Sequence, residues 1–343
     1  MQFAYFGFQQ LDQFRRLQGH TLDRLGLGPV ESPFDIIHEQ PGLKLREYGR
    51  GVADAAPLLI VPAPIKRPYI WDLAPGSSVV RHALSHRAGV YLVEWKEPDH
   101  SPAPGLADYA GAMLAECVDA IRERTGAAKV ILAGHSLGGI FAAIHSALQP
   151  DAVGALVLVD SPLHFAAAGT PARGLPAANN SHATACIPGS MLSAGTARAA
   201  PYNFCTRRYL DRVASLRSHA QSLSHWRVER WTLDELPMSR VLFDDLSSLR
   251  ADNSFMHGQL AVGGVKVGAQ QVRAPLFAVY EPEDGFVPAD AVLEFCHAAG
   301  SADKQLAPYQ GDVGVALQHI GPLVGASAHR DIWPRIFAWL API

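Results

Sequence analysis

The sequence is poor in several features that would assign a chain to a special class of protein. It has four cysteines in 343 residues, too few for a disulfide framework in a chain this long. No apolar run approaches the roughly 20 residues that a membrane span needs, and the N-terminus lacks the charged leader and apolar core of a signal peptide. The 29 basic and 32 acidic residues nearly cancel, so no broad basic field is present for nucleic acid. We therefore expect a cytoplasmic protein that binds a small molecule, and the sequence leaves a homodimer open.

The cysteines also lack the spacing of a metal site, and we expect neither a metal nor a cofactor. Cys186 and Cys205 would be able to pair in an oxidising compartment. We favour buried thiols instead for all four, which are Cys117, Cys186, Cys205 and Cys296.

The order of local patterns predicts an α/β protein built on a mostly parallel sheet. Apolar residues spaced by three and four indicate an amphipathic helix within residues 1–30, and a hairpin is expected over 34–48. After it, strand and helix patterns alternate, which is typical of a parallel sheet flanked by helices. The expected elements are strands at 57–61, 90–95, 129–133 and 155–159, a helix capped by Ser77 and ending near His86, a helix from Asp108 to Gly126, and a helix from 140 to 149.

This alternation stops after residue 160. Residues 166–200 are rich in Ala, Gly, Ser and Pro with little periodicity, and residues 202–249 look helical. A strand pattern returns at 275–280, and a closing helix bent at Pro334 is expected over 331–340. The predicted organisation is an N-terminal part of the core at 1–160, a helical and irregular cap insertion at 161–270, and a C-terminal part of the core at 271–343.

One short motif carries the strongest chemical signal. Residues 134–138 read Gly-His-Ser-Leu-Gly and lie between a strand pattern and a helix pattern. In the α/β-hydrolase fold such a turn exposes a nucleophilic serine beside backbone donors. Gly134 and Gly138 suit the turn because a Cβ at either position would crowd it. We therefore predict an α/β-hydrolase fold with Ser136 as nucleophile; the alternative is a glycine-rich turn whose serine caps the helix.

A serine hydroxyl needs an imidazole base, and the base needs a carboxylate partner. In this fold the chain order is serine, acid, histidine. The acid is expected after a late strand, where Asp284 follows the strand at 275–280. Glu281, Glu283 and Asp160 are rivals for the same position; their other roles are solvated loop charges and, for Asp160, a turn-forming side chain.

The base is expected on a loop before the last helix, and His319 lies there. His297 and His329 are weaker candidates because both fall on expected helices. Acyl transfer also needs two amide donors for the oxyanion. Leu137 supplies the first. Since Pro62 and Pro64 have no N–H, the second is Ala63 or, less favoured, Ile65.

The stretch from Ile60 to Gly139 resembles the polyhydroxyalkanoate synthases, a branch of the α/β-hydrolases. The similarity extends over about 35–160 and 250–325, and the cap matches poorly. Asp284 with Pro288, and His319 with Ile320, resemble that family's acid and base segments. The matching motifs are Val61-Pro62, Tyr69 to Pro75, Ser78-Val79, Trp95 to Asp99, Asp108-Tyr109 and Gly134 to Gly139.

Two departures from that family bear on the reaction. The synthases are expected to carry cysteine in the elbow, where this chain has Ser136, and a histidine tends to follow their catalytic aspartate, where this chain has Gly285. A cysteine passes an acyl group from one thioester to another with little change in free energy, whereas a serine forms an oxyester. A serine is therefore better matched to attack on an existing ester, followed by hydrolysis.

These features favour a serine esterase or thioesterase acting on 3-hydroxyalkanoate esters or oligomers. The alternative is an acyltransferase of the synthase type using hydroxyacyl-coenzyme A. A third possibility is a non-catalytic protein that binds a polyester granule. Six cap arginines are candidates to bind coenzyme A phosphates, although interspersed acidic residues favour a solvated surface of mixed charge: Arg207, Arg208, Arg212, Arg217, Arg227 and Arg230.

Overall fold

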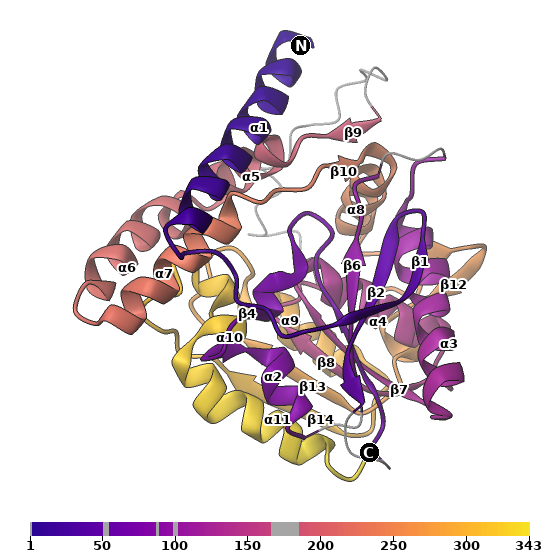
Figure 1. Ribbon diagram of the computed structural model, residues 1–343. Coiled ribbons are helices and arrows are strands. Elements are labelled where there is room, and N and C mark those ends of the chain that lie inside the picture. Colours follow the sequence, from indigo (N-terminus) through magenta and orange to yellow (C-terminus); the bar gives the residue numbers. More distant parts are fainter. Residues whose placement is uncertain (1, 51–54, 87–88, 99–101, 166–184) are drawn as a thin grey trace.

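The computed structural model describes residues 2–50, 55–86, 89–98, 102–165 and 185–343, and an eight-stranded sheet runs through its centre (Figure 1). The strand order is β1-β2-β6-β3-β7-β8-β13-β14. β2 pairs antiparallel with β1 and β6, and the other neighbouring pairs are parallel, as predicted. The strands are β1 (Asp35–Gln40), β2 (Leu43–Arg50), β3 (Leu58–Val61), β6 (Gly89–Trp95), β7 (Val130–His135), β8 (Val153–Val159), β13 (Leu276–Tyr280) and β14 (Lys304–Pro308).

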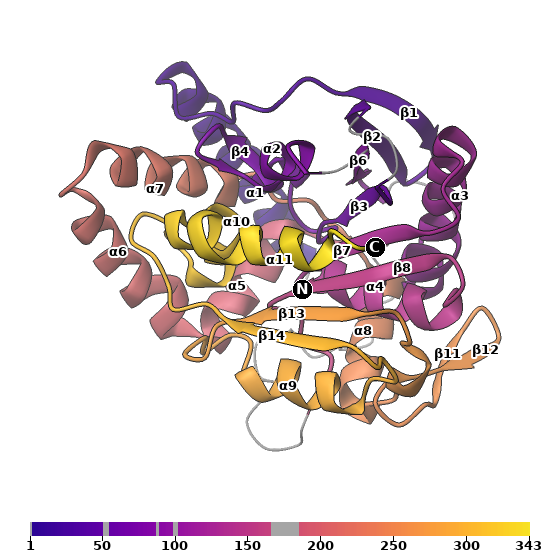
Figure 2. The same ribbon diagram turned by 90° about the horizontal axis from the view of Figure 1, so that it is seen from below.

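Helices cover both faces of this sheet and enclose a separate core on each. In β13, Leu276 and Ala278 face one core, while Phe277 and Val279 face the other, as the period of two in a strand requires. Figure 2 shows α9 and α11 on opposite sides of β13. The first core is covered by α3 (Leu114–Thr125), α4 (Leu137–Leu148) and α9 (Ala289–Ala298), and the second by α2 (Val79–Leu84), α10 (Gly321–Val324) and α11 (Trp333–Leu340).

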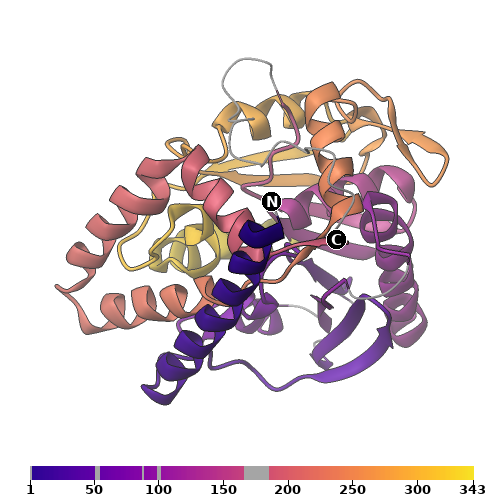
Figure 3. The same cartoon turned by 90° about the horizontal axis from the view of Figure 1, so that it is seen from above.

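The predicted N-terminal helix is present as α1 (Gln2–Arg24) and lies across the cap (Figure 3). Its contacts there include a hydrogen bond and an ion pair. Asp12 Oδ1 accepts a hydrogen bond from the Ser190 amide at 2.8 Å, and Asp23 Oδ1 pairs with Arg230 Nε at 2.6 Å. Several of the apolar residues that predicted the helix remain exposed; these are Phe6, Leu11, Phe14 and Leu17. The helix is therefore attached to the cap by charge and hydrogen bonding as well as by packing.

We call residues 161–270, the predicted insertion, the cap segment. The structure corrects the expectation of an irregular chain up to residue 200, because α5 forms within it; residues 166–184 lie outside the described part. The cap segment contains β9 (Cys186–Ile187), α5 (Gly189–Ala199), a π-helical turn η3 (Tyr202–Arg207), α6 (Arg208–Ser215), α7 (His219–Thr232), β10 (Met238–Ser239), α8 (Arg240–Asp252), β11 (Leu260–Val262) and β12 (Val265–Val267). No helix in the described ranges has the length and apolarity to cross a bilayer.

Several local expectations need correction. Ser78, not Ser77, caps α2, and its Oγ accepts a hydrogen bond from the Arg81 amide. Pro334 is the second residue of α11, which directly continues the π-helical turn Ala328–Ile332. Among the cysteines, Cys117 and Cys296 are buried as expected, but Cys205 is exposed. The remaining short elements are η1 (Pro68–Trp71), β4 (Asp72–Ala74), β5 (Ser77–Ser78), η2 (Asp108–Met113), η4 (Ala269–Gln271), η5 (Gln318–Ile320) and η6 (Ala328–Ile332).

Candidate active site

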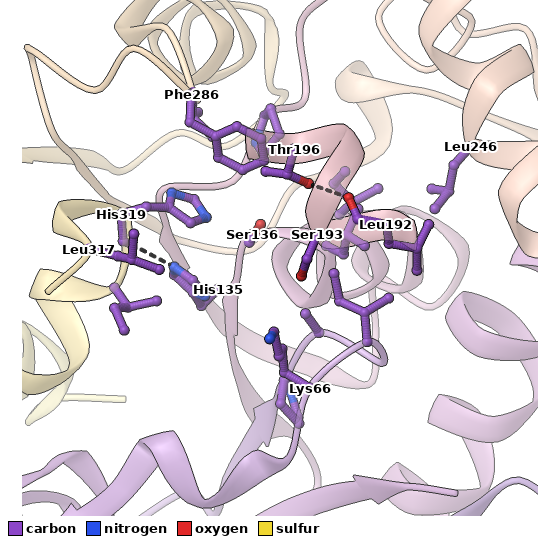
Figure 4. A pocket seen from close by; sticks show the side chains of 18 of the residues that line it. Lys66, His135, Ser136, Leu192, Ser193, Thr196, Leu246, Phe286, Leu317 and His319 are labelled. Atoms are coloured by element: carbon purple, nitrogen blue, oxygen red, sulfur yellow. Dashed lines mark hydrogen bonds between the residues drawn. The ribbon is translucent and has the colours of Figure 1, made fainter. Parts of the chain in front are cut away.

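Ser136 lies in the sharp turn between β7 and α4. Its φ is +54°, a left-handed value that is costly for a residue with a side chain. The turn holds this value because the Ser136 amide donates to Val159 O of the neighbouring strand at 3.0 Å. A Cβ on Gly138 would collide with the backbone of Val61 and Pro62, so only glycine fits there. The local sequence thus forces the serine side chain out of the sheet and into an open cavity (Figure 4).

Asp284 follows β13, and its buried carboxylate accepts three hydrogen bonds. His319 Nδ1 lies 3.1 Å from Asp284 Oδ2. Asp284 Oδ1 accepts from Asn203 Nδ2 at 3.1 Å and from the Phe286 amide at 2.8 Å. The structure therefore brings together the predicted acid and the predicted base, which are 35 residues apart in the chain.

His319 occupies the short turn Gln318–Ile320, and its ring faces the same cavity as Ser136 (Figure 4). The edge-to-face contact with Phe286, at 5.1 Å between ring centroids, keeps water from one side of the imidazole. The Nε2 atom is buried and has no hydrogen-bond partner in the described part of the chain. A substrate or a serine hydroxyl would give this atom its missing partner.

The charges around His319 favour its protonated form. Burial opposes that form, but the hydrogen bond to Asp284 and the charges of Asp284, Asp160 and Glu281 outweigh burial and raise the pKa of the imidazole. The neighbouring His135 differs. Its Nε2 donates to His319 O at 2.8 Å, and burial together with the nearby His319 lowers its pKa well below the usual value. His135 is therefore a neutral group that supports the turn of His319.

Four of the alternative candidates for the acid and the base make other contacts or are exposed to solvent. Glu281 Oε1 forms an ion pair with Arg207 Nη2 at 2.7 Å, and Glu283 is exposed. His297 is exposed on α9, and His329 Nε2 lies 2.9 Å from Leu323 O. These four side chains are therefore not part of the Asp284–His319 pair.

Asp160 is the exception among the rivals. Ligand-type atoms of Asp160, Asp284 and His319 all lie within 4.8 Å of one another. Such a group would be able to hold a metal ion, but Asp284 Oδ2 and His319 Nδ1 already bond to each other. We therefore assign no metal to it.

Three cap residues contact the acid and base loops, a role that the sequence analysis assigned to none of them. Asn203, Arg207 and Asp211 are spaced by four along η3 and α6, so they lie on one helix face. Asn203 donates to Asp284, and Arg207 pairs with Glu281. Asp211 accepts from the amides of Gly314 and Ala316, both at 2.8 Å, just before His319. The spacing of three polar residues in a helical stretch was the available signal, but nothing local identified their partners.

Gly285 explains how Asn203 reaches the acid. A Cβ at position 285 would lie 2.9 Å from Asn203 Oδ1, closer than such contacts allow. A larger side chain there would displace the amide. The glycine that replaces the synthases' histidine at position 285 therefore makes room for the side-chain amide of Asn203 beside Asp284.

The cavity that joins these groups has a volume of about 260 Å³. Leu137 and Ala63, the predicted amide donors, both contribute to its wall. Leu137 is the first residue of α4, so its N–H has no acceptor within the helix. The loop of Ala63 is held by a 2.7 Å hydrogen bond from Trp95 Nε1 to Pro62 O. The two residues that carry the predicted donors thus line the same cavity as Ser136.

The wall of the cavity is mainly apolar and contains no acidic side chain among the described residues. The cap contributes much of it, through Leu192, Phe204, Trp231, Phe243, Leu246 and Leu249. Lys66 also lines it; burial lowers the pKa of this amine to about 8, while Glu235 at 3.0 Å opposes the shift. The apolar part of the wall suits an aliphatic group.

The fold and this constellation define the class of protein. A model of the alpha/beta hydrolase fold family matches residues 57–308, and the chain belongs to that family. Within it, the chain is 29% identical over 348 residues to the poly(3-hydroxyalkanoate) polymerase subunit PhaC of Allochromatium vinosum, covering 97% of this chain and 96% of that protein. The subunit of the same name from Synechocystis sp. is 28% identical, over 96% of this chain and 89% of that one. The predicted resemblance to polyhydroxyalkanoate synthases is confirmed.

Solved structures agree on the fold. Paleococcus ferrophilus monoacylglycerol lipase superimposes with a TM-score of 0.53 at 16% identity, over 88% of this chain and 98% of that one. The enol-lactonase from Burkholderia xenovorans gives a TM-score of 0.51 at 14% identity, over 91% of this chain and all of that one. At such identities the likeness establishes the α/β-hydrolase fold alone.

Proposed function

We propose that this protein is a serine-dependent acyl ester hydrolase, an esterase or thioesterase, in which Ser136 is the nucleophile, His319 the base and Asp284 the acid. The observation that carries the proposal is the bond between Asp284 and His319 beside the strained turn of Ser136. Asp284 fixes the Nδ1–H tautomer of His319, which leaves Nε2 as the acceptor for the serine proton.

The reaction follows from this geometry. Ser136 Oγ attacks the acyl carbonyl while its proton moves to His319 Nε2. The amides of Leu137 and Ala63 stabilise the oxyanion that forms. His319 then gives the proton to the departing alcohol or thiol. Water, deprotonated by the same imidazole, hydrolyses the acyl-enzyme and regenerates Ser136.

The apolar cavity and the similarity to polymerases support a 3-hydroxyalkanoate ester or oligomer as substrate. Hydrolysis is favoured over polymerisation by the chemistry of the nucleophile. An oxyester on Ser136 is less activated than a thioester, so it is less suited to hand an acyl group to another hydroxyl.

The similarity to poly(3-hydroxyalkanoate) polymerases along nearly the whole chain favours a second candidate, an acyltransferase using hydroxyacyl-coenzyme A. The cap arginines support it weakly. Arg207, Arg208 and Arg230 already form ion pairs with carboxylates. Within the described residues Arg212, Arg217 and Arg227 form none, so only these three would be available to phosphates without breaking a pair.

Labelling with a fluorophosphonate tests the hydrolase directly. We expect one adduct, located by mass spectrometry on Ser136, and loss of labelling in His319→Ala. Glu283→Gln, an exposed carboxylate of the same loop as Asp284, serves as the matched control and should label normally. An unlabelled wild-type protein would contradict the proposal and favour a granule-binding role.

Product analysis separates hydrolysis from transfer. The protein is incubated with p-nitrophenyl 3-hydroxybutyrate, with and without an excess of a competing alcohol, and the products are identified by mass spectrometry. We expect the free acid to dominate in both. A dominant new ester would instead establish the acyltransferase.

A further inference from the structure

Asp160 is a buried carboxyl group that the proposed reaction does not use. It follows β8 directly and is only 1% exposed. Its Oδ1 accepts a hydrogen bond from the Glu281 amide at 2.9 Å, whereas Oδ2 has no hydrogen-bond partner within the described residues. A buried carboxyl oxygen without a partner is costly, so the position calls for an explanation.

The backbone of Asp160 is also unusual. Its φ is +42°, and its amide donates to Val279 O at 2.9 Å, which ties the residue to the end of β13. A left-handed residue other than glycine costs free energy and is frequent at functional sites. Two features that oppose stability therefore meet at one residue, beside Asp284 and His319.

Charged groups from three elements face Asp160. Glu281 and Asp284 approach from the end of β13 and the following loop, and His319 from its turn. Tyr309, after β14, also interacts electrostatically with Asp160. Arg207 of the cap forms an ion pair with Glu281. Burial is the main cause that raises the pKa of Asp160, and the charges of Asp284 and Glu281 act in the same direction. The charge of His319 opposes them, and the resulting pKa is about 8. Asp160 is thus shifted toward its neutral form beside the Asp284–His319 pair.

We propose that Asp160 is a second acid of the site, a positioning residue that lies beside the Asp284–His319 pair and supplies the anion for His319 when Asp284 is uncharged. This inference depends on the proposed roles of Asp284 and His319. Two carboxyl groups this close resist simultaneous ionisation, and each one suppresses the charge of the other. Removing the charge of Asp284 lets Asp160 release its proton to solvent. One negative charge remains near the imidazole in both cases, so the imidazolium formed during acylation stays stabilised.

The labelling rate of Ser136 by a fluorophosphonate measures this effect without knowledge of the natural substrate. Where a triad has a single carboxylate, its conversion to the amide costs about 10⁴-fold. We expect Asp284→Asn to slow labelling by only about 10²-fold here, and Asp284→Asn with Asp160→Asn to reach the full loss of about 10⁴-fold. Asn suits position 160 because it tolerates a left-handed φ and keeps an oxygen for the Glu281 amide.

The pH dependence gives a readout that a structural role of Asp160 would not change. In Asp284→Asn, labelling should rise as pH increases through the ionisation of Asp160, below pH 8 because the opposing charge of Asp284 is gone. The double variant should lack this rise and keep only the one that accompanies deprotonation of His319. A single Asp160→Asn variant whose melting temperature matches the wild type shows that the fold is intact; should it melt lower, Asp160→Gly, which accommodates the same φ, replaces it in the double variant.

Two outcomes separate the failures. Labelling that does not depend on His319 overturns the proposed function. Labelling that depends on His319, but is equally slow in Asp284→Asn and in the double variant, overturns the role of Asp160 alone.

Discussion

The two halves of the site are built in different ways. The serine half is local, because β7, the turn and α4 are continuous in sequence and a few glycines determine the position of Ser136. The acid and base half is assembled from distant segments. Asp284 and His319 lie on two loops that η3 and α6 contact through Asn203, Arg207 and Asp211.

This difference has a mechanical consequence. The position of Ser136 depends on backbone geometry within one strand and one helix, so it should survive changes in the cap. The cap contacts the loops of both Asp284 and His319, so changes there should lower activity without moving the serine. Four measurements test this difference between the serine half and the acid and base half of the site.

The largest effect is expected from the local half. Ser136→Ala should lower turnover by about 10⁶-fold, because the nucleophile is lost and only binding and the oxyanion donors remain. The melting temperature should stay the same, since the hydroxyl faces a cavity and its removal leaves no void in the core. Steady-state kinetics and thermal melts check both points. A large fall in melting temperature would show that the serine is structural.

The second measurement is the pH profile of kcat/KM, which reports on the non-local half. Only neutral His319 accepts the serine proton, so activity should fall about tenfold for each pH unit below the pKa of His319. Since Asp284 and its neighbours raise that pKa, the decline should begin above pH 6.5 as the pH is lowered, and activity should be highest on the alkaline side. A profile that is flat down to pH 5 would contradict the assignment of His319 as base.

Asp211→Asn tests whether the cap positions the loop that precedes His319. The amide would turn an N–H₂ group toward the donors of Gly314 or Ala316, which breaks at least one hydrogen bond to the loop. We expect kcat to fall by about 10–100-fold, the range that a misplaced catalytic group costs, with a smaller change in KM. Arg212→Gln, on the exposed side of the same helix, is the control. Equal activity in both variants would show that the cap does not position His319.

The smallest effect is expected at the acid. Asn203→Ala removes one of three hydrogen bonds to Asp284, and Gly285→Ala should displace the same amide. Each should lower kcat by about tenfold, since a hydrogen bond to a charged group contributes about 1.5 kcal/mol. The double variant should be no worse than either single one, because both act on one contact. Additive losses would mean that the glycine has another role.

The same contrast explains which features were predictable. The parallel sheet, the hairpin and the turn of Ser136 follow from periodicity and from glycines that are near in sequence. β14 was missed because Lys304–Pro308 is short, only partly buried and ends in proline, so it lacks the apolar pattern of an inner strand. The position of α5 was missed because alanine, glycine and serine give little periodicity. Asp284 and His319 were predicted from chain order and from their places after a late strand and before the last helix. Asn203 and Asp211 have partners 81 and up to 105 residues away, which no local pattern indicates.

Helix α6 faces the protein with its polar side and solvent with its apolar side. Tyr209 and Leu216 are 64% and 70% exposed, while Asp211 and Ser215 are buried. Detaching this helix would therefore uncover little apolar surface, and its local opening should be inexpensive compared with that of the sheet. In native-state hydrogen exchange, the amides of α6 should become deuterated earlier than those of β7 and β8, and the exchange should quicken when salt weakens the polar contacts.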